Sequence, residues 1–405
     1  MIDIINDQID PEKYITARYW INSKTTIKEA ALHIAIGQSV GNPKERSVWE
    51  TDELFEKHSC KVTSIQEEGT VINHISLVGK TPTLQAGYVD IAFPIANTDF
   101  ATDGISHLLC QLMGGQLDID IIQKCQLKDL KIPDSVRAQF KPNHGINKIR
   151  DFTQCFDKPL LGGIIKPKTG LNEKMLIGMV EQMMHNGINF IKEDEIMANL
   201  PSFGIKERLR VLKPILEYHK NVIYAFCINC DPMHLADNVK TVFHGGGNAV
   251  HINIHSGLGS YRCIRELAPE LFIHYQKSGD KLITNPRHDY HIAWRVLCQL
   301  AVLSGVDFIH AGMHGGYAND DPEMLKDCCE VLVNGGVIPA LSCGMHPGLV
   351  ASTKEVFGND WMANVGGALH GHPSGTGAGV RAMVQAISGN HLTEYEDAIK
   401  KWGVS

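Results

Sequence analysis

The chain of 405 residues lacks any long apolar run. No stretch approaches the roughly 20 residues that a helix needs to cross a bilayer, which argues against membrane-spanning helices. The chain also lacks a dense basic run, and its formal net charge is −7. Proteins that follow the phosphates of nucleic acids or adhere to anionic membranes need such a run. We therefore expect neither of these partners and predict a small-molecule one.

A secretory signal is lacking too, because residues 1–8 hold no basic segment followed by an apolar core. We therefore expect a cytoplasmic protein. The cysteine count is 11, and an odd number in a long chain favours reduced thiols over a disulfide framework. Cys227 and Cys230 have the spacing of a redox motif but fall in a strand-like run. We expect them, and the pair Cys328 and Cys329, to pack in the core.

What the chain does contain indicates two domains. A hydrophobic content of 43% and a charged content of 20% are typical of a globular protein. Residues 1–135 predict a small α+β domain in which helices cover one face of an antiparallel sheet. The expected helices cover residues 26–35, with Thr26 as a possible cap, and 103–113, and the expected strands cover 14–21, two short runs within 60–78, and 87–93.

Residues 136–405 have a different pattern, in which short apolar runs alternate with helix-like segments. Eight such strands, each followed by a crossover, predict a C-terminal (β/α)8 barrel. The runs cover residues 160–165, 188–191, 222–228, 249–254, 271–273, 306–309, 337–341 and 362–365.

Two of these strands end in clustered charges. The second ends in Lys192, Asp194 and Glu195, and the first ends in Lys166 and Lys168. A single lysine there could simply mark where the chain leaves the core. Adjacent carboxylates repel each other unless a cation joins them, so the pattern predicts a hard divalent cation, Mg²⁺ above all.

The other strands also deliver polar or glycine residues to the end of the barrel where chemistry takes place. His274 and His310 are expected to hydrogen-bond substrate oxygens, and the glycine-rich loop at residues 311–317 could close over a substrate. Glycines after the last two strands indicate a phosphate site, although glycine pairs also serve as plain turns. The residues concerned are Asn229, His255, His274, His310, Ser342, Gly344, Gly366 and Gly367.

The segments at residues 163–171 and 187–195, with those around Ser342 and Gly366, resemble the large subunit of ribulose-1,5-bisphosphate carboxylase/oxygenase (RuBisCO). The resemblance covers nearly the whole chain. It implies an N-terminal ferredoxin-like domain before the barrel. It also implies a homodimer in which one subunit's N-terminal domain closes the partner's active site.

The resemblance further implies roles for single residues. Lys192 would be carbamylated by CO2 and would hold Mg²⁺ together with Asp194 and Glu195, because a carbamate supplies the hard oxygen that an amine lacks. Lys166 and Lys168 would lie at the reacting carbons. The remaining residues would line the pocket (Asn229, His274 and His310) or hold hydroxyls or phosphate (Ser342, Gly344, Gly366 and Gly367).

Several positions depart from the family pattern. The carboxylase needs a lysine at the tip of the loop after strand six, but Tyr317 stands there and no lysine occurs between His310 and Lys326. Other expected residues are also replaced: a glutamate by Gly37, a Thr-Trp pair by Asn42-Pro43, an asparagine by Gly115 and an arginine by Tyr275. We therefore predict a RuBisCO-like protein that does not fix CO2.

The expected reaction is the formation of an enolate from a phosphorylated keto compound or oxo-sugar compound. Tautomerisation of a phosphorylated diketone is one form, but the enolase that performs it has a lysine base about where Gly115 stands. Decarboxylation gives the same kind of enolate without a base. Two alternatives stay open, a non-catalytic binding descendant and a true carboxylase.

Overall fold

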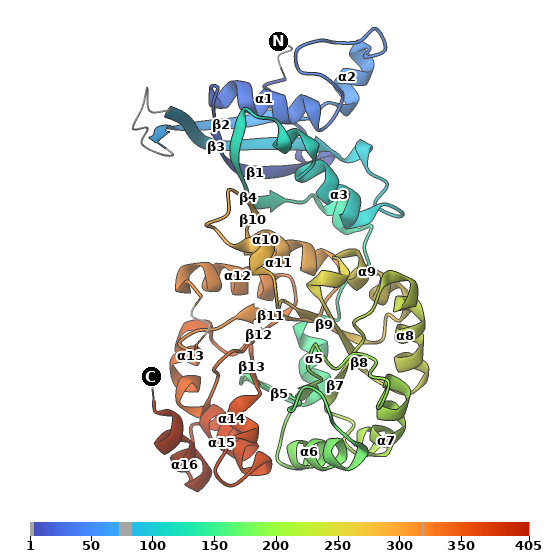
Figure 1. Ribbon diagram of the computed structural model, residues 1–405, viewed down its shortest axis with the longest axis vertical. Coiled ribbons are helices and arrows are strands. Elements are labelled where there is room, and N and C mark those ends of the chain that lie inside the picture. The colour runs from blue at the N-terminus through green and yellow to red at the C-terminus, as the bar shows by residue number, and fades with distance from the viewer. Residues whose placement is uncertain (1–3, 73–82, 318–319, 405) are drawn as a thin grey trace. The chain divides into compact units, whose positions relative to one another are not determined.

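The computed structural model describes residues 4–72, 83–317 and 320–404, which fall into two compact units (Figure 1). One unit comprises Met1–Phe140 with Asp280–Leu300, and the other comprises Lys141–Gly279 with Ala301–Ser405. The sequence analysis predicted a single domain boundary, at residue 135. The grouping of 280–300 with the first unit was not foreseen, and it follows from pairing between strands far apart in the sequence.

The first unit is built on a five-stranded sheet in the order β10-β4-β1-β3-β2. Strand β1 (Tyr14–Ser23) pairs antiparallel with both β3 (Thr83–Pro94) and β4 (Ile122–Lys131). The short strand β10 (Tyr290–Ile292) adds to β4 in parallel. Arg295 and Gln299, on the helix that follows, both bond Asp129 at 2.8 Å. These contacts explain why the segment 280–300 belongs to this unit.

The two helices predicted for this unit are present as α1 (Ile27–Gly37) and α3 (Gly104–Leu112), and its other helices were not predicted. Thr26 caps α1, because its side chain accepts a hydrogen bond from the Glu29 N–H at 3.1 Å. Strand β2 runs unbroken over Lys61–Ile72, where two short strands were expected, and the rest of that prediction lies outside the described residues. The helices are α1 (Ile27–Gly37), α2 (Asp52–His58), α3 (Gly104–Leu112), α4 (Asp134–Arg137) and α10 (Lys281–Thr284), with α11 (Trp294–Leu303) after β10.

The second unit is a closed barrel of eight parallel strands, as predicted. The strands are β5 (Leu160–Ile164), β6 (Phe190–Lys192), β7 (Ile223–Cys227), β8 (Ala249–Asn253), β9 (Phe272–Gln276), β11 (Phe308–Gly312), β12 (Ile338–Leu341) and β13 (Met362–Val365). The helices are α5 (Gly145–Thr153), α6 (Glu173–His185), α7 (Ile205–Tyr218), α8 (Pro232–His244), α9 (Gly259–Leu267), α12 (Pro322–Asn334), α13 (Val350–Phe357), α14 (Gly367–His370), α15 (Thr376–Ser388) and α16 (Thr393–Trp402).

A packed apolar layer fills the barrel near the start of its strands. Leu160, Phe190, Phe272, Phe308 and Met362 project inward there and are at most 3% exposed. Because this layer closes one end, polar side chains further along the strands can gather only at the other end. In the part of the chain that the structure describes, no helix combines the length and the apolar character that a bilayer span requires.

Candidate active site

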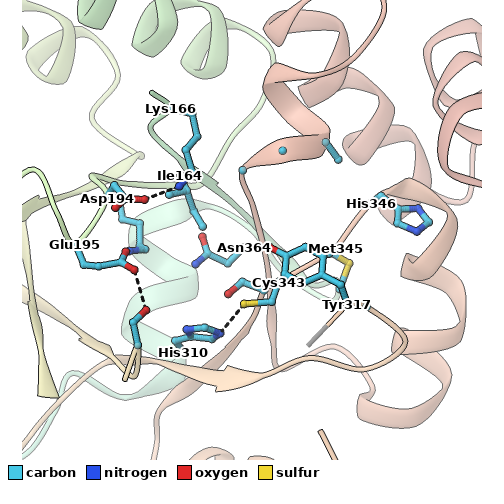
Figure 2. A pocket seen from close by; sticks show the side chains of 18 of the residues that line it. Ile164, Lys166, Asp194, Glu195, His310, Tyr317, Cys343, Met345, His346 and Asn364 are labelled. Atoms are coloured by element: carbon cyan, nitrogen blue, oxygen red, sulfur yellow. Dashed lines mark hydrogen bonds and ion pairs between the residues drawn. The ribbon is translucent and has the colours of Figure 1, made fainter. Parts of the chain in front are cut away.

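A cavity of about 520 Å³ lies at the carboxyl ends of the barrel strands (Figure 2). Three residues that the sequence analysis placed at this end of the barrel, Asn229, His255 and His274, are not among those that line the cavity. The others all line the cavity: Lys166, Lys168, Lys192, Asp194, Glu195, His310, Ser342, Gly344, Gly366 and Gly367. The structure therefore brings these predicted groups together from five of the eight strand ends, and Gln276 of β9 adds a sixth.

Lys192 ends β6 and is buried, with 1% of its surface exposed. Its Nζ donates to the Glu193 carbonyl at 3.3 Å and lies 3.7 Å from Glu195 Oε2. Burial lowers the pKa of the Lys192 ammonium, whereas the charges of Glu195 and Asp194 act in the opposite direction. The Lys192 amine is thus shielded from water and lies beside two carboxylates.

The two carboxylates are paired differently. Asp194 Oδ2 accepts a hydrogen bond from Lys166 Nζ at 2.5 Å (Figure 2). Glu195 Oε1 accepts one from Ser278 Oγ at 2.8 Å. Burial raises the pKa of Glu195, but the charge of Lys192 and the bond from Ser278 outweigh this and bring it to about 2. Glu195 is therefore ionised at neutral pH.

Glu193, between these groups, turns away from the cavity. Its carboxylate accepts from Arg208 Nε at 2.7 Å, from Arg208 Nη2 at 2.9 Å and from the Cys227 N–H at 2.8 Å. Both charged side chains are fully buried. Strand alternation predicts that Lys192 and Asp194 share one face and that Glu193 lies on the other. Arg208 also donates to the carbonyls of Phe203 and Ala198, so the pair holds the loop that follows Glu195.

Asn229 lies behind the site rather than on its surface. Its Nδ2 donates to the Glu195 carbonyl at 2.6 Å, and its Oδ1 accepts from the Asn253 N–H at 2.7 Å. The side chain therefore joins the ends of β6, β7 and β8. This arrangement orients the backbone of Glu195.

His274 also differs from its predicted position, because β9 continues to Gln276 rather than ending at Ile273. The His274 ring packs within the barrel, 5.7 Å from the Phe190 ring between centroids. Gln276, two residues further on the same face, lines the cavity instead. Tyr275, expected in place of the family's arginine, stacks on Tyr261 with centroids 4.5 Å apart. Gln276 is the residue of β9 that lines the cavity, and Lys277 follows it in the sequence.

The loops after β11 and β12 meet at close range. A Cβ on Gly316 would lie 2.4 Å from the Cys343 carbonyl oxygen, and one on Gly344 would lie 2.8 Å from the Tyr317 nitrogen. Both positions therefore require glycine. His310 Nε2 lies 3.7 Å from Cys343 Sγ. Burial, together with the charge of Lys277, lowers the pKa of His310 to about 3, so its ring is neutral at physiological pH.

The end of β13 forms the remaining wall. A Cβ on Gly367 would meet nothing within 4 Å, and one on Gly366 would lie 3.4 Å from Lys166 Cε. The glycines thus leave room beside the lysine. Asn364, which the sequence analysis did not single out, also lines the cavity and is 1% exposed. The sequence feature that could have identified Asn364 is its polar amide at an inward position of the otherwise apolar run 362–365.

Comparison with known proteins identifies the family of the chain. The N-terminal domain of the ribulose bisphosphate carboxylase large chain matches residues 7–136, and the catalytic domain of that chain matches residues 145–401. The chain belongs to the RuBisCO large-chain family. The predicted resemblance is confirmed.

Relatives within this RuBisCO family carry different names. The chain is 30% identical to a 2,3-diketo-5-methylthiopentyl-1-phosphate enolase from Exiguobacterium sibiricum, over 97% of this chain and 99% of the relative. It is 29% identical to a 3-oxo-isoapionate-4-phosphate decarboxylase from Rhizobium rhizogenes, over 92% of each. It is 26% identical to the ribulose bisphosphate carboxylase of Pyrococcus furiosus, over 97% of this chain and 94% of the relative.

The fold of the RuBisCO family is also found by structural comparison. The octameric carboxylase/oxygenase of Pyrococcus horikoshii superposes with a TM-score of 0.87 at 23% identity, over 99% of this chain and 96% of that chain. At this level of identity the likeness shows the fold. It confirms the predicted barrel preceded by an N-terminal α+β domain.

Asp194, Glu195 and Lys192 are suitable ligands for a hard cation only if Lys192 is modified. Among the described residues, no group of three or more His, Cys, Asp or Glu side chains could hold a metal ion. Asp194 and Glu195 supply carboxylate oxygens, and the third group facing them is the Lys192 amine. Hard cations prefer oxygen ligands. The set is therefore suitable for Mg²⁺ when Lys192 carries a carboxyl group.

Proposed function

We propose that this RuBisCO-family chain is an Mg²⁺-dependent enzyme that forms and then protonates the enolate of a phosphorylated keto or oxo-sugar compound, without fixing CO2. The observation that carries the proposal is the convergence of Lys166, Lys192, Asp194 and Glu195 on one cavity. Relatives named as an enolase and as a decarboxylase of phosphorylated compounds support it.

Charge balance supports a carbamate on Lys192. In the structure, the ammonium groups of Lys166 and Lys192 face the carboxylates of Asp194 and Glu195. A carbamate on Lys192 would make three anions at one strand end, and a divalent cation together with Lys166 would balance them. The bound cation would supply positive charge beside a substrate oxygen, which lowers the energy of an enolate.

Lys166 is the group we assign to proton transfer. Its side chain is 31% exposed, and its contact with Asp194 is typical of the protonated amine. A protonated amine can deliver a proton to the enolate carbon. Decarboxylation needs only this acid, whereas tautomerisation needs a base first. Lys166 as the acid is compatible with both reactions, and Lys168 is a second cation in the cavity for an anionic substrate group.

The loops after β12 and β13 form the proposed phosphate site. Ser342, Gly344, Gly366 and Gly367 line this part of the cavity, and Gly344 has a φ of +111°. A side chain is disfavoured at such a φ, so the backbone can approach an anion closely. His310, neutral at physiological pH, is suited to hydrogen bonding rather than to charge neutralisation.

Two alternatives have less support. A carboxylase needs a cation on the loop after β11, yet Gly315, Gly316 and Tyr317 form the cavity side of that loop. A non-catalytic binding protein would not need a buried lysine beside two carboxylates, because such a group is costly to bury. We also propose a homodimer, which light scattering in solution would test.

The reaction can be identified by proton exchange. The purified protein would be incubated in D2O with Mg²⁺, bicarbonate and a panel of ketose phosphates and phosphorylated oxo acids. Tautomerisation washes deuterium into the recovered substrate, whereas decarboxylation releases CO2 and leaves deuterium in the product. Absence of both exchange and CO2 release across the panel would contradict the proposed function.

A further inference from the structure

Two carboxamide side chains in the cavity have no role in the chemistry above. Gln276 on β9 is 3% exposed and Asn364 on β13 is 1% exposed, and both line the cavity. Within the described part of the chain, Gln276 Oε1, Asn364 Oδ1 and Asn364 Nδ2 have no hydrogen-bond partner. A buried polar atom left unpaired costs about 1–3 kcal/mol, and native proteins contain few. Other buried atoms of the described residues also lack a partner, but these three belong to side chains that line the cavity, where a ligand could bond them.

The bonds around Gln276 determine which of its amide atoms is free. Gln276 and Ser278 Oγ lie 2.6 Å apart, and Ser278 Oγ lies 2.8 Å from Glu195 Oε1. Ser278 Oγ donates to Glu195 Oε1, so its single hydroxyl proton is used there. Gln276 must then donate to Ser278 through Nε2. Its unpaired atom is the Oε1 acceptor, which requires a donor.

Asn364 has space to serve a ligand. It lies opposite Gly162 of β5 in the strand register, and a Cβ on Gly162 would come within 3.0 Å of Asn364 Oδ1. The last torsion of an asparagine side chain is broad, so the amide plane can turn toward the cavity at low cost. In Figure 2 the side chain stands among the labelled cavity residues.

We infer that Gln276 and Asn364 select a substrate that carries hydroxyl groups on its carbon chain, a polyhydroxylated phosphorylated ketone or sugar acid. The inference rests on the proposed function and names its substrate class. A hydroxyl can donate to Gln276 Oε1 and can both donate to and accept from Asn364. An alkyl or thioether chain would leave all three atoms unpaired, and sites built to bond a hydroxyl reject such analogues strongly.

Stability gives the first test, because the two roles of a buried amide have opposite consequences. Asn364→Leu replaces an unpaired amide by an apolar group of similar shape, so the ligand-free melting temperature should stay the same or rise. Asn248→Leu is the matched control. Its Oδ1 accepts from the Tyr224 N–H and its Nδ2 donates to the Val222 carbonyl, both at 2.9 Å, so its loss should lower the melting temperature. Equal destabilisation by both changes would assign Asn364 a structural role and overturn the inference.

Ligand discrimination gives the second test. Calorimetry with Mg²⁺ and bicarbonate would compare D-ribulose 5-phosphate and D-xylulose 5-phosphate with 5-phosphooxypentan-2-one, which has the same carbonyl and phosphate positions but no hydroxyl. We expect at least one ketose phosphate to bind about 5-fold to 150-fold more tightly than the deoxygenated probe. Gln276→Met and Asn364→Leu should each reduce this ratio, mainly by weakening the ketose.

The outcomes separate the two proposals. Equal affinity of the wild-type protein for all three probes, or an unchanged ratio in both variants, would overturn the inference while leaving enolate chemistry intact. If the wild-type protein bound no phosphorylated ketone and turned none over, the proposed function and this inference would fail together.

Discussion

Lys192 is the residue on which the proposed chemistry depends most directly. Replacing it by methionine keeps a similar volume and removes the amine, so we expect turnover to fall by at least about 1,000-fold. The melting temperature should fall only slightly, because Glu195 is 22% exposed and keeps its bond from Ser278 when the Lys192 ammonium is removed. Turnover and thermal unfolding of Lys192→Met would be measured side by side. ¹³C NMR with labelled bicarbonate should show a carbamate signal in the wild-type protein only, and its persistence in the variant would place the carbamate elsewhere.

Ser278 is a positioning residue for Glu195. Since its hydroxyl donates to the carboxylate at 2.8 Å, Ser278→Ala should weaken Mg²⁺ binding by about 10-fold to 100-fold. Isothermal titration with Mg²⁺, and Mn²⁺ paramagnetic resonance, would measure this directly. Ser260→Ala is the control, because Ser260, on helix α9, also donates a hydrogen bond, to the Ser256 carbonyl, and does not line the cavity. Equal Mg²⁺ affinity in both variants would exclude the positioning role.

Among single residues, the sequence predicted those that a short stretch of neighbouring residues makes recognisable. Adjacent carboxylates after an apolar run identified Asp194 and Glu195 without any knowledge of the fold. Gln276 and Asn364 were missed, because the lack of a partner is a property of the folded molecule. The sequence analysis placed His274 at the end of its strand, where the structure has Gln276. The apolar run ended there, while the strand continued through Tyr275, which is buried against Tyr261.

Among the elements, strand β6 and helix α7 are joined by the buried Glu193–Arg208 pair. Arg208→Met would leave the Glu193 carboxylate buried without its partner, and we expect a loss of about 3–5 kcal/mol in the free energy of unfolding. Denaturant titration would measure it. The control is Arg210→Met on the same helix, because the Arg210–Glu173 pair is 65% and 51% exposed and should contribute at most about 1 kcal/mol.

A double variant separates pairing from packing at this junction. If the loss in Arg208→Met comes from the unpaired carboxylate, adding Glu193→Gln should restore part of it, because a neutral amide is cheaper to bury than a charge. No recovery in the double variant would assign the loss to the guanidinium's bonds with Phe203 and Ala198 instead.

Barrel strands were predictable as elements, and their exact ends were not. Strands buried on both faces are apolar runs, and all eight runs became strands. Strand ends depend on neighbouring strands, and β9 extends further because it pairs with β8 as far as Gln276. Strand β10 went unseen for the same reason, since its partner β4 lies more than 150 residues earlier in the chain.

At the scale of the whole molecule, family membership determines the fold and leaves the reaction open. Relatives of nearly equal coverage are named as an enolase, a decarboxylase and a carboxylase. The barrel and the lysine-carboxylate cluster cannot distinguish these reactions, because a stabilised enolate can be an intermediate in each of them. The loop after β11 and the amides facing the cavity are where the distinction must lie.

The loop after β11 leads to the prediction for the whole enzyme. The protein, incubated with Mg²⁺, ribulose 1,5-bisphosphate and labelled bicarbonate, should incorporate no label into acid-stable product above a heat-treated control. A carboxylated intermediate adds a negative charge beside this loop, where Tyr317 offers no cation and no lysine occurs between His310 and Lys326. The same preparation must turn over a substrate in the D2O assay, so that an inactive sample is not mistaken for a non-carboxylating one. Incorporation proportional to enzyme would instead establish the carboxylase, with a charge such as that of Lys277 replacing the missing loop lysine.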